Sequence, residues 1–109
     1  MTALHEERLG RLTGALAEDG LDGIVVYGNA WQADYLRFAT DLAVVEGDAA
    51  AVVLADGATH AWFENTVEAD RARTEVPLAE VTASDDPVEA VTSYLARLEN
   101  GRQIGRAHV

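Results

Sequence analysis

A β-hairpin signal near the middle of the chain constrains the fold more than any other feature. Two apolar runs in the segment AAAVVLADGATHAWFEN, residues 49–65, flank the pair Asp56-Gly57. The second residue of such a pair readily takes a positive φ, which a tight connection between two strands requires. We therefore predict two strands joined by a turn at Asp56-Gly57.

The N-terminal part of the chain predicts a helix followed by a buried strand. Leu9, Leu12 and Leu16 recur at helical spacing within residues 2–20, and Gly20 is a natural C-cap. The segment DGIVVYGN, residues 22–29, is a short β-branched run between turn residues. A short helix is expected next, in AWQADYLRFATDL, residues 30–42.

Two more elements are expected after the hairpin. Asn65 and Glu68 resemble a capping box and predict a short helix that ends at Arg73. The segment EVPLAEV, residues 75–81, is interpreted as a strand. Pro77 cannot donate a ladder hydrogen bond, so this strand is placed at a sheet edge.

The last predicted helix lies in SDDPVEAVTSYLARLENG, residues 84–101. Asp86 is its expected cap and Pro87 occupies its first turn. Its expected apolar face consists of Val88, Val91, Leu95 and Leu98. The whole order is α-β-α-β-β-α-β-α, which predicts one α/β domain with a single mixed β-sheet and helices on its faces.

Composition narrows the classes of partner and compartment. The formal net charge of the 109-residue chain is −11, and all eight of its basic residues are arginine. Such a surface repels phosphate backbones and anionic lipid, so neither a nucleic-acid nor a membrane partner is expected. The chain has no cysteine, which excludes disulfides and thiolate zinc sites. With no apolar signal-peptide region at the N-terminus, a cytoplasmic location is expected.

Residues typical of catalysis do not form a complete set. His5, His60 and His108 are not spaced as metal motifs require. His60 and Glu64 are open to a reading as metal ligands. The favoured interpretation is that His60 is a half-exposed histidine on a strand, without a metal. Asp85 and Asp86 are interpreted as helix-capping residues rather than as a carboxylate pair.

The segment YGNAWQADYLRFAT, residues 27–40, offers the candidate contact residues. Trp31, Tyr35 and Phe38 follow a helical spacing, and core packing is the favoured interpretation for Trp31 and Tyr35. Asp34 and Arg37 are expected to point away from the aromatic residues, toward solvent or a partner. Asp34, Tyr35 and Arg37 are therefore the candidate substrate or interface contacts.

Residues 8–42 resemble the start of the N-terminal domain of the creatinase/prolidase/aminopeptidase P family. The shared pattern is a helix, the segment GLDGIVV, a turn and a Tyr-Leu pair, here Tyr35-Leu36. The later ADG turn matches the next hairpin of that domain, so the resemblance covers about Glu6 to Val81. Gln32 stands where the family motif N-x-x-Y-L-T/S-G-F has asparagine, and YLRFAT lacks the motif's glycine.

The resemblance implies a ribonuclease H-like, non-catalytic domain of a pita-bread hydrolase. In that family a C-terminal domain cleaves Xaa-Pro peptides or related C–N bonds. It usually does so with two divalent metal ions, such as Mn, Co or Zn, held by two Asp, one His and two Glu. Creatinase itself works without metal. The N-terminal domain helps to form a homodimer and limits access to the site.

None of those metal ligands can be assigned to a residue of this chain. Two alternatives remain open, a stand-alone interaction or dimerisation module without catalysis and a small-ligand domain using a turn at Tyr27–Asn29.

The last six residues, IGRAHV, match one reading frame of a common sequencing-library adapter. We therefore expect a domain at residues 1–103 and a non-native tail at residues 104–109, with the catalytic domain missing. A native tail is the alternative.

Overall fold

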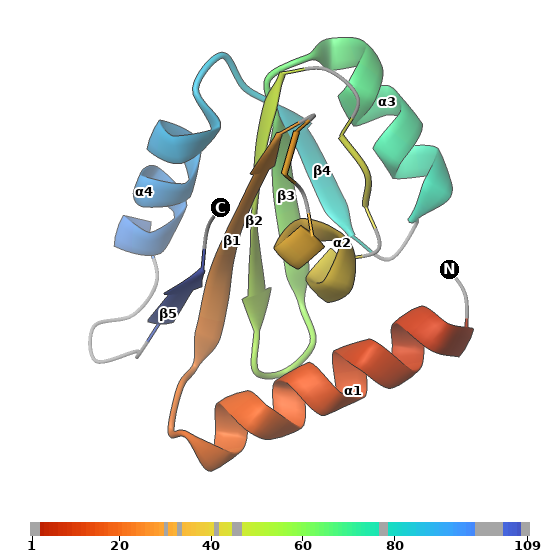
Figure 1. Ribbon diagram of the computed structural model, residues 1–109. Coiled ribbons are helices and arrows are strands. Elements are labelled where there is room, and N and C mark those ends of the chain that lie inside the picture. Colours follow the sequence, from red (N-terminus) through yellow and green to blue (C-terminus); the bar gives the residue numbers. More distant parts are fainter. Residues whose placement is uncertain are drawn as a thin grey trace.

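The computed structural model describes residues 3–29, 31–32, 34–40, 42–44, 47–76, 79–97 and 104–107. This part of the chain contains four helices and five strands, which alternate except where β3 directly follows β2 (Figure 1). Their bounds are α1 Ala3–Glu18, β1 Gly23–Asn29, α2 Asp34–Thr40, β2 Asp48–Leu54, β3 Thr59–Phe63, α3 Thr66–Glu75, β4 Glu80–Ala83, α4 Pro87–Arg97 and β5 Ile104–Ala107.

The strands form one mixed sheet in the order β4-β3-β2-β1-β5. β2 is antiparallel to both β1 and β3, whereas the β3–β4 and β1–β5 pairs are parallel. The predicted α/β class, with a single mixed sheet and helices on its faces, is confirmed (Figure 1). β5 falls in the segment predicted to be a non-native tail. Its pairing with β1 does not bear on the origin of those residues, so that expectation stays a prediction.

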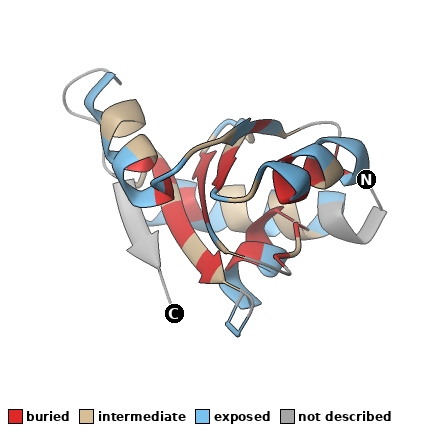
Figure 2. Ribbon diagram, turned by 90° about the horizontal axis from the view of Figure 1, so that it is seen from above, coloured by how far each residue is buried: buried red, intermediate tan, exposed pale blue. Residues whose placement is uncertain are grey.

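The two faces of the sheet are covered by different helices. On one face, strand residues such as Val26 and Phe63 cluster with residues from α1, α2 and α3. On the other face, Val25 and Trp62 cluster with residues of α4, which include Val91. The central strand β2 therefore has no solvent side and is buried from Ala49 to Leu54, as the buried strands between the helices show (Figure 2).

Helix α1 ends as its sequence predicts. Gly20 has a φ of 70°, Leu21 N–H donates to Leu16 C=O at 2.8 Å, and Gly20 N–H donates to Ala17 C=O at 3.2 Å. This pair of bonds is a Schellman motif, in which glycine accepts the left-handed conformation without a Cβ penalty. The motif turns the chain directly into β1.

The hairpin prediction is confirmed in detail. Gly57 has a φ of 92°, and Leu54 N–H donates to Ala58 C=O at 2.8 Å. The Asp56 carboxylate accepts from Ala58 N–H at 2.9 Å and holds the turn. β2 and β3 then pair from Ala49 with Phe63 onward.

The segment 75–81 differs from its prediction. α3 continues through Glu75, and Val76 N–H still donates to Ala72 C=O at 3.0 Å, so these residues complete a helix instead of beginning a strand. β4 begins only at Glu80, but it does lie at the sheet edge, as expected. Pro77 lies outside the described residues.

The apolar face of α4 is also shifted from the prediction. Val91 is fully buried and Leu95 packs beside it, whereas Val88 is 54 % exposed. The buried side of the helix begins at Pro87, and the next position projects about 100° away from it. Leu98 lies outside the described residues.

In the part of the chain that the structure describes, no helix combines the length and the apolar character that a membrane crossing needs.

Candidate functional site

The candidate contact residues follow a turn that Asn29 organises. The Asn29 side-chain oxygen accepts from the backbone N–H groups of Trp31 and Gln32, each at 2.9 Å. Asn29 N–H in turn donates to Gln32 C=O at 2.9 Å. This arrangement is an asparagine turn, which ends β1 and carries the chain toward α2.

Helix α2 buries one face and exposes the other. Leu36, Ala39 and Thr40 face inward, and the Thr40 hydroxyl donates to Leu36 C=O at 2.6 Å. Since those three residues occupy the inner side, Tyr35 and Phe38 are left outward, 50 % and 48 % exposed.

The interpretation of Trp31 and Tyr35 as core residues is wrong. Trp31 is 92 % exposed, because the helix begins only at Asp34 and the helical spacing therefore does not extend back to the tryptophan. The stripe that the sequence does bury on this helix starts at Leu36. Both sets of residues have helical spacing, so the spacing alone did not indicate which of them is buried.

An apolar groove lies beside the outward face of α2. Its volume is about 490 Å³, and α1, β1 and α2 all contribute to it. Its lining residues are Leu12, Ile24, Val26, Asp34, Tyr35, Phe38 and Ala39. Asp34 and Tyr35 therefore share one wall of the groove, contrary to the expectation that Asp34 points away from the aromatic residues. Arg37 is exposed but is not part of the lining.

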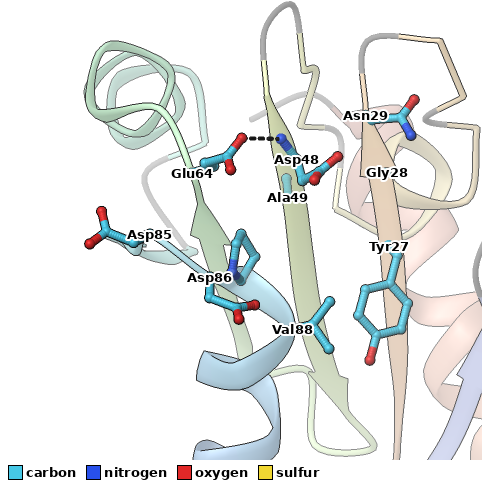
Figure 3. Close-up of a pocket in the computed structure, with 10 residues that line it drawn as sticks. Tyr27, Gly28, Asn29, Asp48, Ala49, Glu64, Asp85, Asp86 and Val88 are labelled. Carbon is cyan, nitrogen blue, oxygen red and sulfur yellow. Dashed lines mark hydrogen bonds between the residues drawn. The ribbon is translucent and has the colours of Figure 1, made fainter.

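A second, larger pocket of about 690 Å³ lies where β1, β3 and β4 end and β2 and α4 begin (Figure 3). Its lining residues are Tyr27, Gly28, Asn29, Asp48, Ala49, Glu64, Asp85, Asp86, Pro87 and Val88. One alternative placed a ligand-binding turn at residues 27–29, but these are the last residues of strand β1. The pocket is therefore bordered on this side by a strand and not by a phosphate-binding loop.

Two carboxylates of this pocket, Glu64 and Asp86, accept backbone hydrogen bonds. Glu64 accepts from Asp48 N–H at 3.3 Å (Figure 3), and Asp86 accepts from Glu89 N–H at 3.1 Å. The second bond confirms that Asp86 caps α4, while Asp85 lies at the rim, one residue before the cap. Within the described ranges, no three His, Cys, Asp or Glu residues gather as a metal site would require.

His60 lies on strand β3 and is less exposed than expected. Its side chain is 18 % exposed, Nδ1 lies 3.5 Å from Glu80, and Nε2 lies 3.0 Å from the Thr82 hydroxyl. Burial lowers the pKa of His60, and Arg97 lowers it further, while Glu80 acts in the opposite direction. The two side chains that were open to a reading as metal ligands contact other groups instead. His60 lies against Glu80 and Thr82, and Glu64 accepts from Asp48 N–H.

Comparisons with known proteins identify the fold. The chain is similar to the N-terminal, creatinase/prolidase-like domain of a protein from Corynebacterium diphtheriae that is assigned as a metallopeptidase. The TM-score is 0.73 and the sequence identity is 16 %, and the similarity covers 96 % of this chain and 76 % of that one. It is similar to an Xaa-Pro aminopeptidase P from Streptococcus thermophilus, with a TM-score of 0.67 and 14 % identity over 94 % and 91 % of the two chains.

A third similar structure is the N-terminal domain of the cytoplasmic peptidase PepQ from Mycobacterium tuberculosis, with a TM-score of 0.55 and 14 % identity over 94 % and 92 % of the two chains. No family model and no curated protein sequence matches the chain. At these identities the likeness concerns the fold. The chain has the fold of the creatinase/prolidase-like N-terminal domain, as the resemblance in its sequence predicted.

Proposed function

We propose that this chain is the non-catalytic N-terminal domain of a creatinase/prolidase/aminopeptidase P-type hydrolase. The observation that carries the proposal is the fold likeness, which spans 94–96 % of the chain in the three similar structures. The sequence resemblance over about Glu6 to Val81 points the same way. In this proposal a C-terminal domain, missing from this chain, hydrolyses Xaa-Pro peptides or related C–N bonds.

The chemistry of the proposed parent resides in that C-terminal domain. Its two divalent metal ions need a cluster of carboxylates and histidine, and the described residues of this chain contain no such cluster. In this proposal the two pockets described above make contacts and do not take part in bond cleavage. The N-terminal domain contributes to a homodimer and limits access to the active site, with Asp34, Tyr35 and Arg37 as its contact residues.

The remaining parts of the proposal follow from charge and from the comparisons. A net charge of −11 disfavours nucleic-acid and membrane partners. A cytoplasmic location is supported by the lack of cysteine and by the similarity to a peptidase described as cytoplasmic.

The decisive experiment extends the open reading frame beyond Gln103 in genomic DNA. We expect a downstream domain that supplies two Asp, one His and two Glu. The two-domain protein should then cleave an Xaa-Pro dipeptide when Mn²⁺ or Co²⁺ is added, and the 109-residue chain should not. Turnover by the 109-residue chain itself would contradict the non-catalytic assignment.

A stand-alone interaction module is the second candidate, and the outward aromatic residues of α2 favour it. A reading frame that continues without those five ligands would select this module over the hydrolase domain. A native stop codon directly after the same six-residue ending, IGRAHV, would do so too.

A further inference from the structure

The outward face of α2 combines aromatic rings with an apolar groove. Tyr35 and Phe38 are about half exposed, and both line the groove that Leu12 and Ile24 extend. Trp31, which precedes the helix, is 92 % exposed. Exposed aromatic side chains beside an apolar groove are typical of a protein–protein contact surface.

Two opposite charges lie on the same outward face, Asp34 at the edge of the groove and Arg37 outside its lining. Asp34 and Arg37 are three residues apart, so they are neighbours on the helix surface. Among the described residues, neither side chain makes an ion pair with another. The helix therefore presents one negative and one positive group, in order along its axis, next to the two rings.

This order of charges is complementary to itself. A two-fold axis in the contact plane, perpendicular to α2, sets two copies of the helix antiparallel. Asp34 of each copy then faces Arg37 of the other, because an isologous contact repeats every pair twice. Both charge pairs lie alongside the Tyr35 and Phe38 rings, which meet beside the groove.

We infer that the α2 face is a homodimer contact whose occupant is a second copy of this chain, packed antiparallel through α2. This inference rests on the dimerisation part of the proposed function and names its surface. The rings and the groove supply most of the affinity, and the two charge pairs fix the orientation. The net charge of −11 on each copy opposes association, so the dimer is weak and concentration-dependent at physiological salt.

Charge-swap variants of the 109-residue chain test the inference by sedimentation equilibrium over a concentration series. The unchanged chain should dimerise. Asp34→Arg alone and Arg37→Asp alone each place like charges opposite one another, and each should weaken dimerisation at least about tenfold. The double variant Asp34→Arg/Arg37→Asp should restore it. An equimolar mixture of the two single variants should also restore it, as a heterodimer.

A matched pair of apolar changes tests the contribution of the aromatic rings. Phe38→Ser should weaken dimerisation, whereas Val67→Ser, which changes a 73 % exposed residue on α3, should leave it unchanged. Far-UV circular dichroism verifies that each variant is folded, and Trp31 fluorescence should shift to shorter wavelength as the dimer forms.

Two outcomes would overturn the inference. If the chain dimerises but neither the swaps nor Phe38→Ser changes the dissociation constant, the α2 surface is wrong while dimerisation stands. If the chain is monomeric at every concentration, its dimerisation fails altogether. The hydrolase assignment is tested separately by the downstream reading frame, so its failure is distinguishable from both.

Discussion

The imidazole of His60 lies flat against the indole of Trp62, with ring centroids 4.0 Å apart and an interplanar angle of 10°. Tyr94 from α4 approaches the two rings edge-on, at 5.3 Å from His60 and 5.2 Å from Trp62. Arg97 lies over the outer face of Tyr94 at 5.9 Å. The cluster therefore joins strand β3 to helix α4 through stacked and perpendicular rings.

His60 should make the protein less stable in mild acid. Its pKa is lowered in the folded chain by burial, so the unfolded chain binds more protons below the ordinary pKa of 6.5. The free energy of unfolding should therefore fall as the pH drops from about 6.5 toward the lowered pKa. Urea unfolding at pH values between about 7.5 and 5 measures this.

The control for the acid effect is His60→Gln, which cannot gain the proton. Its unfolding free energy should depend less on pH over the same interval than that of the unchanged chain. An NMR titration of the His60 ring with a midpoint at or above 6.5 would contradict the expectation, because the attraction of Glu80 would then outweigh burial.

Arg71 should be the most costly arginine to remove. It pairs with Glu68, whose side chain is only 9 % exposed, and also donates to Ala43 C=O at 3.2 Å and to Glu75 at 3.3 Å. Arg71→Ala removes a charged partner of a buried carboxylate and releases the segment before β2. We expect a loss of about 1–3 kcal/mol in the free energy of unfolding.

Arg11→Ala is the matched control for Arg71. Arg11 pairs with Glu7 on the surface of α1, where the two side chains are 70 % and 57 % exposed. Such pairs contribute little, so thermal unfolding should hardly change. An equal loss in both variants would show that burial of Glu68 is not the cause.

Gly47→Ala and Gly10→Ala should have opposite effects. Gly47 has a φ of 79°, and an added Cβ would lie 2.9 Å from the Glu64 carboxylate oxygen that accepts from Asp48 N–H. Its replacement should destabilise the protein by about 1–2 kcal/mol. Gly10 lies inside α1 with nothing within 4 Å of an added Cβ, so its replacement should stabilise by about 0.5–1 kcal/mol. Chemical denaturation midpoints compare the two.

Asn65 should contribute as the cap of α3. Its side-chain oxygen accepts from Val67 N–H at 2.9 Å and from Glu68 N–H at 3.1 Å. Asn65→Ala should therefore cost about 1 kcal/mol, while Asn65→Asp keeps an acceptor and should stay within about 0.5 kcal/mol of the unchanged chain. A full loss in the aspartate variant would show that the asparagine N–H₂ group is the part that matters.

Local sequence determined the elements whose signals act within a few residues. Gly20 ends α1, Asp56-Gly57 turns the hairpin, and Asn65 and Asp86 cap α3 and α4, all as expected. Each of these effects depends on one backbone conformation or on one nearby hydrogen bond, so a short window contains the whole cause. The order of the elements from α1 to α4 follows largely from such windows.

Tertiary structure alone decided which residues of α2 and α4 face inward. Trp31, Tyr35 and Phe38 have the spacing of a buried stripe, but so do Leu36 and Ala39, and only the second set fits under α1 and against β1. In α4, Val88 and Val91 were both predicted on the apolar face, but Val88 is exposed and Val91 is buried. A helical period says that one side of a helix is buried, and the side is chosen by the elements packed against it. The aromatic residues Trp31, Tyr35 and Phe38 are therefore left exposed.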